Sequence, residues 1–449
     1  MPGDSETSQW RYLRLAAYLA SLAAMILLVA FASKPLFYDE PWYLNTVGYL
    51  NEFGFSHEFF AKYPGYAGPL ITFVHSALEP ITHLHAPGVR LVSVGGLIVC
   101  LLALAWAAKS IGAKAPWLAG LSLLAIPMVW GSSTLAMTET PAIALGCLGV
   151  AAYLASLKAS TRWSGWGLAL AGGILFSLGI TGRQTFLAAI PALALVGLSK
   201  EWRAHAAFFV VGSLMVAGPL FLEWGGLSSQ FNQARVAANQ TRTFNLAYGF
   251  LSFGYGAIAA LILSPRLFSS LSRKWLILAF AGGIFINLVA FRMHFLPALG
   301  IAQSILPDAM LGPMTLLGGS IFFGIGSAFA GTLLHHMWVN QRDSIQLALL
   351  AAAGILFFTP VCIAHTFGGR YVFVALPFLL LACLRYQTGN EKWRFARHSI
   401  GIAAGIAVGV TQLYIVPIKL WDTAWAPELH LYFPHLLDAH PELLEMIKQ

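Results

Sequence analysis

The fold is decided by the first apolar stretch of the chain, residues 15–32, which reads LAAYLASLAAMILLVAFA. A helix rises about 1.5 Å per residue, so this stretch spans roughly 27 Å, close to the ~30 Å hydrocarbon core of a bilayer. Backbone groups in lipid must be paired internally, which favours a helix. Residues 1–10 are polar and acidic rather than basic. We therefore expect a retained transmembrane helix and not a cleaved signal peptide.

The composition extends this prediction to the whole chain. Of the 449 residues, 58% are hydrophobic and only 10% are charged, and the mean hydropathy is +0.72. Soluble globular proteins carry about 25% charged residues. The sequence thus predicts an all-α, polytopic integral membrane protein that forms a single transmembrane domain over residues 1–449.

Long apolar stretches recur along the chain and predict about thirteen transmembrane helices. They cover 13–32, 89–108, 116–132, 141–157, 166–181, 184–199, 205–222, 247–264, 275–291, 311–334, 345–364, 371–384 and 398–417. Residues 33–88 differ, because their apolar stretches are short and mixed with charged and aromatic residues. We expect a long first outer loop here, with amphipathic interfacial helices near 41–53 and 68–84. Residues 223–246 form a second outer loop, and 419–449 form an outer C-terminal tail.

The basic residues set the orientation of these helices. Most of the 26 Lys and Arg residues fall in alternate short connections, as the positive-inside rule requires when the N-terminus is cytoplasmic. The net charge of +8 is therefore distributed over loops and does not form a nucleic-acid-binding patch. We expect membrane lipids and no nucleic acid as partners. The charged residues on the outer side gather at helix ends.

An acidic pair, Asp39-Glu40, follows the first apolar stretch and lies among aromatic residues in PLFYDEPWY, residues 35–43. Two adjacent carboxylates at a membrane surface are costly to desolvate, which favours a functional role. The alternative is an acidic loop that only faces water.

Further charged residues occur at the outer ends of predicted helices. Glu139 precedes Pro141 at a helix start, where it either serves the site or complements the helix dipole. Arg183 lies in a tight turn, and Arg370 follows two glycines and precedes Tyr371. Arginine binds phosphate in a bidentate way, although an interfacial arginine can also reach lipid headgroups without a specific ligand. Arg292 and His294 form a third candidate phosphate site, weighed equally against an interfacial role.

These positions carry a resemblance to a known class. A long first outer loop with an acidic pair resembles the GT-C class of membrane glycosyltransferases, which use lipid-phosphate-linked sugars. A more specific likeness is to the dolichyl-phosphate-glucose-dependent α-1,2-glucosyltransferase family. It covers about a third of the chain and depends on four short motifs, Tyr38-Asp39-Glu40, Tyr63-Pro64-Gly65-Tyr66, Arg183-Gln184-Thr185 and Gly369-Arg370-Tyr371-Val372-Phe373.

The resemblance implies an inverting transfer of a monosaccharide from a polyprenyl (dolichyl or undecaprenyl) phosphate to an acceptor hydroxyl. One carboxylate is sufficient as general base, because the leaving group is a preformed phosphate. Asp39 is the first candidate and Glu40 the alternative. Glu139 resembles a second carboxylate that orients a sugar. The remaining substrate-binding candidates are Arg183, Arg370, Tyr371, Arg292, His294 and Tyr63. The acceptor is a glycan, a lipid or a protein, and the sugar is left open.

No cofactor or metal is expected. The four cysteines lie inside apolar stretches and read as small buried hydrophobes. His75, His83, His85 and the pair His335-His336 lack a clear ligand spacing, and nucleotide-binding motifs are absent from the sequence.

Two other functions compete with the transferase. A transporter or flippase of a lipid-linked or polar solute would also have many helices, but it should place ionisable groups near helix centres. A non-catalytic subunit with this fold is the third reading. The expected location is the bacterial inner membrane with the site facing the periplasm. The alternative is the endoplasmic reticulum membrane with the site facing the lumen.

Overall fold

A computed structural model describes residues 4–34, 36, 39–239, 244–297, 307–363, 367–387 and 390–415. The predicted outer tail, 419–449, lies outside these residues. The α-helices of the described part are α1 (Asp4–Ala30), α2 (Glu40–Phe53), α3 (His57–Lys62), α4 (Leu70–Thr82), α5 (Gly88–Ser110), α6 (Pro116–Leu121), α7 (Pro127–Ser133), α8 (Glu139–Ser156), α9 (Arg162–Ile180), α10 (Ala189–Ala194), α11 (Arg203–Met215), α12 (Ala217–Trp224), α13 (Gln230–Asn239), α14 (Leu246–Leu263), α15 (Arg273–Ile286), α17 (Asp308–Val339), α18 (Ser344–Phe358), α19 (Leu376–Cys383) and α20 (Glu391–Val410). The all-α prediction is confirmed for this part of the chain.

The predicted number of transmembrane helices is not confirmed. Ten helices of the described residues are long and apolar enough to cross a membrane, or eleven if α11 and α12, bent by 43°, form one crossing. Neither of the predicted spans 116–132 and 184–199 contains a helix long enough to cross a membrane, because their apolar helices, Pro116–Ala125 and Gln184–Leu198, are shorter. In the first, Ile126 is extended and Pro127 starts a new helix. The second alternates 3₁₀ and α segments. Apolar composition alone did not reveal these breaks.

Small residues allow the central helices to pack closely. Helix α8 packs against α5 and α9, and α9 packs against α11. At the α8–α9 crossing, a Cβ on Gly149 would lie 2.5 Å from the carbonyl oxygen of Gly172. Such close backbone approach is common between membrane helices. Lipid is as apolar as the side chains, so helix association there depends on van der Waals packing and not on the hydrophobic effect.

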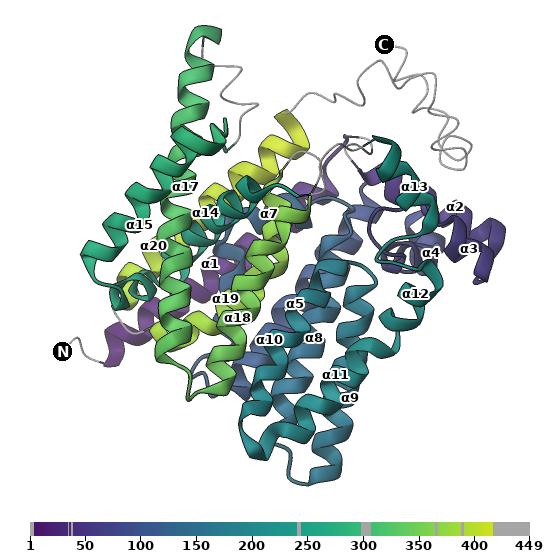
Figure 1. The fold of residues 1–449 in the computed structure, drawn as a ribbon, viewed down its shortest axis with the longest axis horizontal. Helices are drawn as coiled ribbons and strands as arrows, with labels where there is room; N and C mark the ends of the chain where they lie inside the picture. Colours follow the sequence, from purple (N-terminus) through teal and green to yellow (C-terminus); the bar gives the residue numbers. More distant parts are fainter. Residues whose placement is uncertain are drawn as a thin grey trace.

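The segment predicted as the first outer loop, residues 33–88, contains helices at both predicted positions, α2 and α4, and the short α3 between them. Figure 1 shows these three helices grouped with α12 and α13 at one end of the molecule. Phe59, Tyr63, Leu220 and Trp224 form a small apolar core between the two outer loops. The two predicted loops are therefore joined into one layer. Helix α2 belongs to this layer and begins next to Asp39.

Candidate active site

Asp39 stands at the start of α2 with its carboxylate turned away from its own helix. It occupies the N-cap position but makes no capping hydrogen bond with its side chain. Its Oδ2 instead lies 2.6 Å from Nη1 of Arg370, and 41% of the Asp39 side chain is exposed. An N-cap aspartate normally accepts a hydrogen bond from the first turn. The carboxylate of Asp39 is thus directed at a guanidinium and remains open to solvent.

The neighbouring carboxylate, Glu40, has the opposite environment. It is fully buried and forms a bidentate ion pair with Arg90 of α5, with Nε–Oε1 and Nη2–Oε2 distances of 2.9 and 2.7 Å. Its Oε1 also accepts a hydrogen bond from the backbone N–H of Ala136 at 2.9 Å, and Arg90 Nη1 donates to the carbonyl of Lys34. These contacts leave the Glu40 carboxylate sealed from solvent, which is at odds with the alternative prediction that it is the base.

Glu139 is the inner member of the site. It is the first residue of α8, and its side chain is fully buried. Its Oε1 pairs with Nη2 of Arg183 and lies 3.8 Å from Nε of Arg370. Ion pairing with two arginines goes beyond the helix-dipole role that was weighed for this residue.

Arg183 reaches this point because of the tight turn between α9 and the 3₁₀ helix Gln184–Ala188. Gly182 makes the turn possible, since a Cβ there would lie 2.7 Å from the side chain of Leu70 and 2.8 Å from that of Ala142. Burial lowers the pKa of the Arg183 guanidinium. The buried carboxylate of Glu139 is its ion-pair partner.

Tyr371 joins the two arginines. Its hydroxyl accepts a hydrogen bond of 3.1 Å from Nη2 of Arg370. Its ring lies beneath both guanidiniums, 5.0 Å from that of Arg370 and 5.6 Å from that of Arg183. Cation–π contact of this kind orients a guanidinium without consuming its hydrogen-bond donors.

Exposure decreases stepwise through the cluster. The exposed fraction of the side chain is 41% for Asp39, 27% for Arg370, 13% for Arg183 and 0% for Glu139. A ligand would therefore meet Asp39 and Arg370 first. Two carboxylates and two guanidiniums neutralise each other here, so an incoming anion competes with a carboxylate for an arginine. The exposed Asp39–Arg370 pair is the one that can open at lower cost.

Tyr43 is a site residue that the sequence reading missed. It lies one helical turn after Asp39 and donates its backbone N–H to the Asp39 carbonyl. Burial raises the pKa of its hydroxyl to about 12, and the nearby charge of Asp39 acts in the same direction. The charges of Arg183 and Arg370 act on this pKa in the opposite direction. The spacing of four residues from Asp39 was the available signal.

Tyr63 does not reach this cluster in the described contacts. Its side chain is fully buried, and its hydroxyl donates to the carbonyl of Gly68 at 3.2 Å. Its ring stacks on Trp224, and its carbonyl accepts a hydrogen bond from Ser229. This placement is at odds with the prediction of direct substrate contact and gives Tyr63 the role of joining the two outer loops.

Arg292 and His294 lie apart from the cluster as well. Both are exposed, and Nδ1 of His294 lies 2.9 Å from the hydroxyl of Thr315 in α17. Within the described ranges, no hydrogen bond or ion pair connects either residue to Asp39, Glu139, Arg183 or Arg370. Their proposed phosphate contact stays a prediction.

The other sequence predictions concern cysteine and metal. Cys100, Cys147 and Cys383 are buried free thiols, whereas Cys362 is exposed. In the part of the chain that the structure describes, no group of three or more His, Cys, Asp or Glu side chains is arranged to hold a metal ion. The expectation that the protein requires no metal stays a prediction.

The chain is similar to solved proteins in its fold but not closely in its sequence. No protein-family model matches the chain, and neither does any curated protein sequence. The archaeal oligosaccharyltransferase AglB from Archaeoglobus fulgidus, solved with an inhibitory peptide and a dolichol-phosphate, is 14% identical with a TM-score of 0.50. The alignment covers 97% of this chain and 60% of AglB.

A second solved protein shows a weaker similarity. ArnT from Cupriavidus metallidurans bound to undecaprenyl phosphate is 15% identical, with a TM-score of 0.44 and coverage of 94% of this chain and 81% of ArnT. The overall fold is similar to that of AglB. The finer α-1,2-glucosyltransferase likeness receives no support from these comparisons.

Proposed function

We propose that this protein is an inverting membrane glycosyltransferase that transfers a monosaccharide from a polyprenyl phosphate carrier to an acceptor hydroxyl. The observation that carries the proposal is the exposed carboxylate of Asp39 on Arg370, with Arg183 and Glu139 behind it. A carboxylate base beside two phosphate-binding guanidiniums is the set of groups that this reaction needs.

The fold similarity supports the choice of donor. AglB, with a similar fold, was solved with a dolichol-phosphate. We extend that ligand class to this chain because Arg370 and Arg183 can bind a phosphate from the exposed side of the cluster. The ring of Tyr371 would keep both guanidiniums oriented while their N–H groups exchange a carboxylate oxygen for a phosphate oxygen as hydrogen-bond acceptor.

In the proposed reaction, the donor phosphate takes the place of Asp39 on Arg370. The released carboxylate of Asp39 then accepts the proton of the acceptor hydroxyl. The hydroxyl oxygen forms a bond to the anomeric carbon as the bond from that carbon to the phosphate oxygen breaks. The products are the glycosylated acceptor and the polyprenyl phosphate, held by Arg183 and Arg370. Charge stabilisation and positioning supply most of the rate, since the leaving group is already activated.

Glu139 has a supporting role in this scheme. It remains buried on Arg183 and fixes that guanidinium. Its second carboxylate oxygen accepts a hydrogen bond of 3.4 Å from the hydroxyl of Thr138, and we assign its remaining lone pair to a sugar hydroxyl. Glu40 has a structural role, because Arg90 and Ala136 occupy its carboxylate. We place the site on the outer face of a bacterial inner membrane, in keeping with the predicted orientation.

The test is transfer of radiolabelled sugar from a panel of polyprenyl-phosphate monosaccharides by the purified protein in nanodiscs, with membrane lipids and glycans as acceptors. Wild type is compared with Asp39→Asn and with the control Glu52→Gln, an exposed carboxylate on the same helix. We expect one donor to be used, with activity about 10²–10⁴-fold lower in Asp39→Asn and unchanged in the control.

Two results would count against the proposal. Full activity of Asp39→Asn would remove the assigned base. Absence of transfer and of donor binding with every carrier, in a protein shown to be folded, would favour a transporter. Reconstituted vesicles would then be assayed for movement of the lipid-linked sugar.

A further inference from the structure

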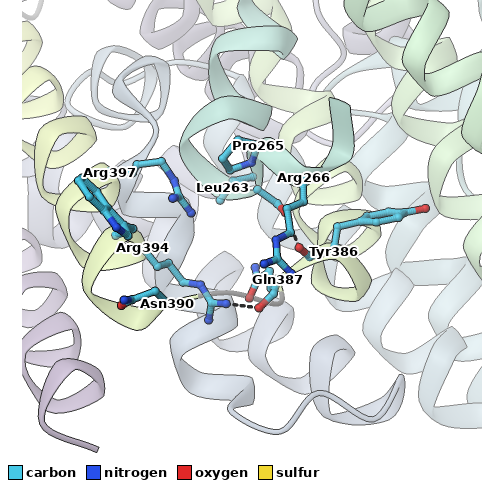
Figure 2. Close-up of a pocket in the computed structure, with 10 residues that line it drawn as sticks. Leu263, Pro265, Arg266, Tyr386, Gln387, Asn390, Arg394 and Arg397 are labelled. Atoms are coloured by element: carbon cyan, nitrogen blue, oxygen red, sulfur yellow. Dashed lines mark hydrogen bonds between the residues drawn. The ribbon is translucent and has the colours of Figure 1, made fainter. Parts of the chain in front are cut away.

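A group of arginines at the opposite end of α1 surrounds a cavity that the proposed reaction does not use. The cavity has a volume of about 320 Å³ and lies between the 3₁₀ helix Pro265–Ser270 and α20. Three arginines line it, Arg266, Arg394 and Arg397, and none of its ten lining residues is acidic. Figure 2 shows these three side chains around the cavity, with Arg394 bonded to the carbonyl of Gln387.

The positive charge beside this cavity exceeds the negative charge of its partners. Glu391 is shared by three guanidiniums, with distances of 3.7 Å to Arg11, 3.1 Å to Arg14 and 2.9 Å to Arg394. Arg14 and Arg394 are 4% and 8% exposed. Buried like charges are costly unless an anion compensates them. Of these three arginines only Arg394 lines the smaller cavity, where it meets Arg266 and Arg397 and no acidic residue, so the cavity wall carries net positive charge that an anion would compensate.

A larger cavity continues the same basic surface. It measures about 950 Å³ and shares Gln387 and Arg394 with the smaller one. Its lining adds six further basic residues and three acidic ones: Arg11, Arg14, Lys114, Lys158, Arg342 and Arg385, with Glu201, Asp343 and Glu391. Basic residues therefore outnumber acidic ones in its wall, although Arg385 pairs with Asp343. Arg394 therefore forms part of the wall of both cavities.

This region is separate from the candidate active site. Arg14 and Asp39 lie toward opposite ends of α1, and the helix between Arg14 and Ala30 alone extends roughly 24 Å. By the positive-inside rule the arginine-lined end faces the cytoplasm, whereas Asp39 faces outward. A ligand here would not compete directly with the sugar donor.

We propose that Arg266, Arg394 and Arg397 form a binding site for a phosphate group at the inner membrane face. Guanidinium groups bind phosphate oxygens through paired, charge-assisted hydrogen bonds, and three of them around one small cavity suit a single tetrahedral anion. The phosphate belongs either to the headgroup of an anionic lipid of the inner leaflet or to a free phosphate ion.

Binding to the full-length protein in detergent tests the site. Dioctanoyl phosphatidic acid and inorganic phosphate are titrated separately by isothermal titration calorimetry. Tight binding of phosphatidic acid alone identifies a lipid site, and binding of both with similar affinity identifies a site for the phosphate ion. We expect the affinity to fall about tenfold in Arg266→Gln and in Arg397→Gln, because each removes one charged hydrogen-bond donor group.

Three matched variants keep the result specific. Lys274→Gln removes an exposed charge that does not line the cavity, and it should bind like wild type. Arg370→Ala disables the proposed outer phosphate site and should also leave this binding unchanged. Arg266→Lys retains the charge and should lose only part of the affinity, which keeps the test valid if Arg397→Gln fails to fold.

The proposal is overturned if neither probe binds to wild type or if Arg266→Gln and Arg397→Gln bind as wild type does. Equal weakening by Lys274→Gln would show diffuse attraction, and loss of binding in Arg370→Ala would assign the ligand to the outer site. Both of these outcomes contradict a site at Arg266, Arg394 and Arg397.

Discussion

Glu40 and Arg90 form a bidentate ion pair in which both side chains are completely buried. The pair connects the start of α2 to α5, and the additional bond from Ala136 connects it to the segment that leads into α8. Asp39 adjoins one end of this connection, and Glu139 lies three residues beyond the other. The Glu40–Arg90 pair thus fixes the separation between the proposed base and the inner carboxylate.

Removing one partner of this pair should destabilise the protein. Arg90→Met leaves a buried carboxylate without its counter-ion, which costs about 3–5 kcal/mol, and Glu40→Gln should also lower the unfolding midpoint. The double variant Glu40→Gln/Arg90→Met should recover part of the loss. Thermal unfolding in detergent measures all three. Unchanged stability in Arg90→Met would contradict the assigned role.

The two site arginines should respond differently to truncation. Arg370→Ala removes a partly exposed guanidinium, so we expect donor affinity to fall about tenfold or more with little loss of stability. Arg183→Ala should weaken donor binding and also destabilise the fold, because Glu139 is left buried without its partner.

Equilibrium binding of the donor together with unfolding midpoints distinguishes these effects. Glu139→Gln/Arg183→Gln should restore stability without restoring binding. Normal donor affinity in Arg370→Ala would contradict its assignment to the phosphate, and Arg273→Ala, an exposed arginine of α15, serves as control.

Tyr43→Phe tests the residue that follows Asp39 by one turn. The hydroxyl of Tyr43 has its pKa raised to about 12 by burial, so it stays protonated over the working pH range and can donate a hydrogen bond. We expect a loss of about two- to tenfold in kcat, the effect of one neutral hydrogen bond. The pH–rate profile between pH 5 and 9 should keep its shape, and a new inflection in the variant would be inconsistent with this role.

His75 of α4 should make the outer layer sensitive to acid. Its side chain is buried, and burial lowers the pKa of the imidazole from 6.5 to about 4. The unfolded chain therefore binds a proton between these values while the folded chain does not. Stability is full above pH ~6.5 and falls as the pH drops toward 4, by on the order of 3 kcal/mol.

Unfolding midpoints measured from pH 7.5 to 4 should show this loss in wild type and a smaller one in His75→Gln. The exposed His57 supplies the control variant His57→Gln. A His75→Gln curve parallel to that of wild type would rule out this residue as the source.

Sugar transfer should not depend on a divalent metal. After dialysis against EDTA, we expect activity to stay within about twofold of the untreated enzyme, because the proposed scheme assigns phosphate binding to Arg183 and Arg370. Activity that disappears with EDTA and returns with Mg²⁺ or Mn²⁺ would overturn this expectation.

The sequence predicted the helical class, the helices of the first outer loop and most candidate residues, because each leaves a local signal. Apolar length marks a transmembrane helix, and a lone charge at its outer end is conspicuous. The structure brings Asp39, Glu139, Arg183, Arg370 and Tyr371 into one cluster from four separate segments, because Arg370 and Tyr371 are neighbours in one 3₁₀ helix.

Three features left no local signal. Asp39 and Glu40 are adjacent and chemically alike, and their different burial depends on Arg90, which is 50 residues away from Glu40. Arg90 itself looks like an ordinary residue near the start of a helix. The breaks within 184–198 depend on packing that hydropathy does not record, whereas the break at Ile126 is marked in the sequence by Pro127.

The third contact of Glu40 has a consequence for how this chain can diverge. Its donor is the main-chain N–H of Ala136, which nineteen of the twenty amino acids would supply equally well. Substitutions at position 136 therefore preserve this hydrogen bond, and only proline, which has no backbone N–H, would remove it. Natural variants should therefore change the side chain at 136 within the limits of its buried volume, whereas changes at 40 and 90 should occur together.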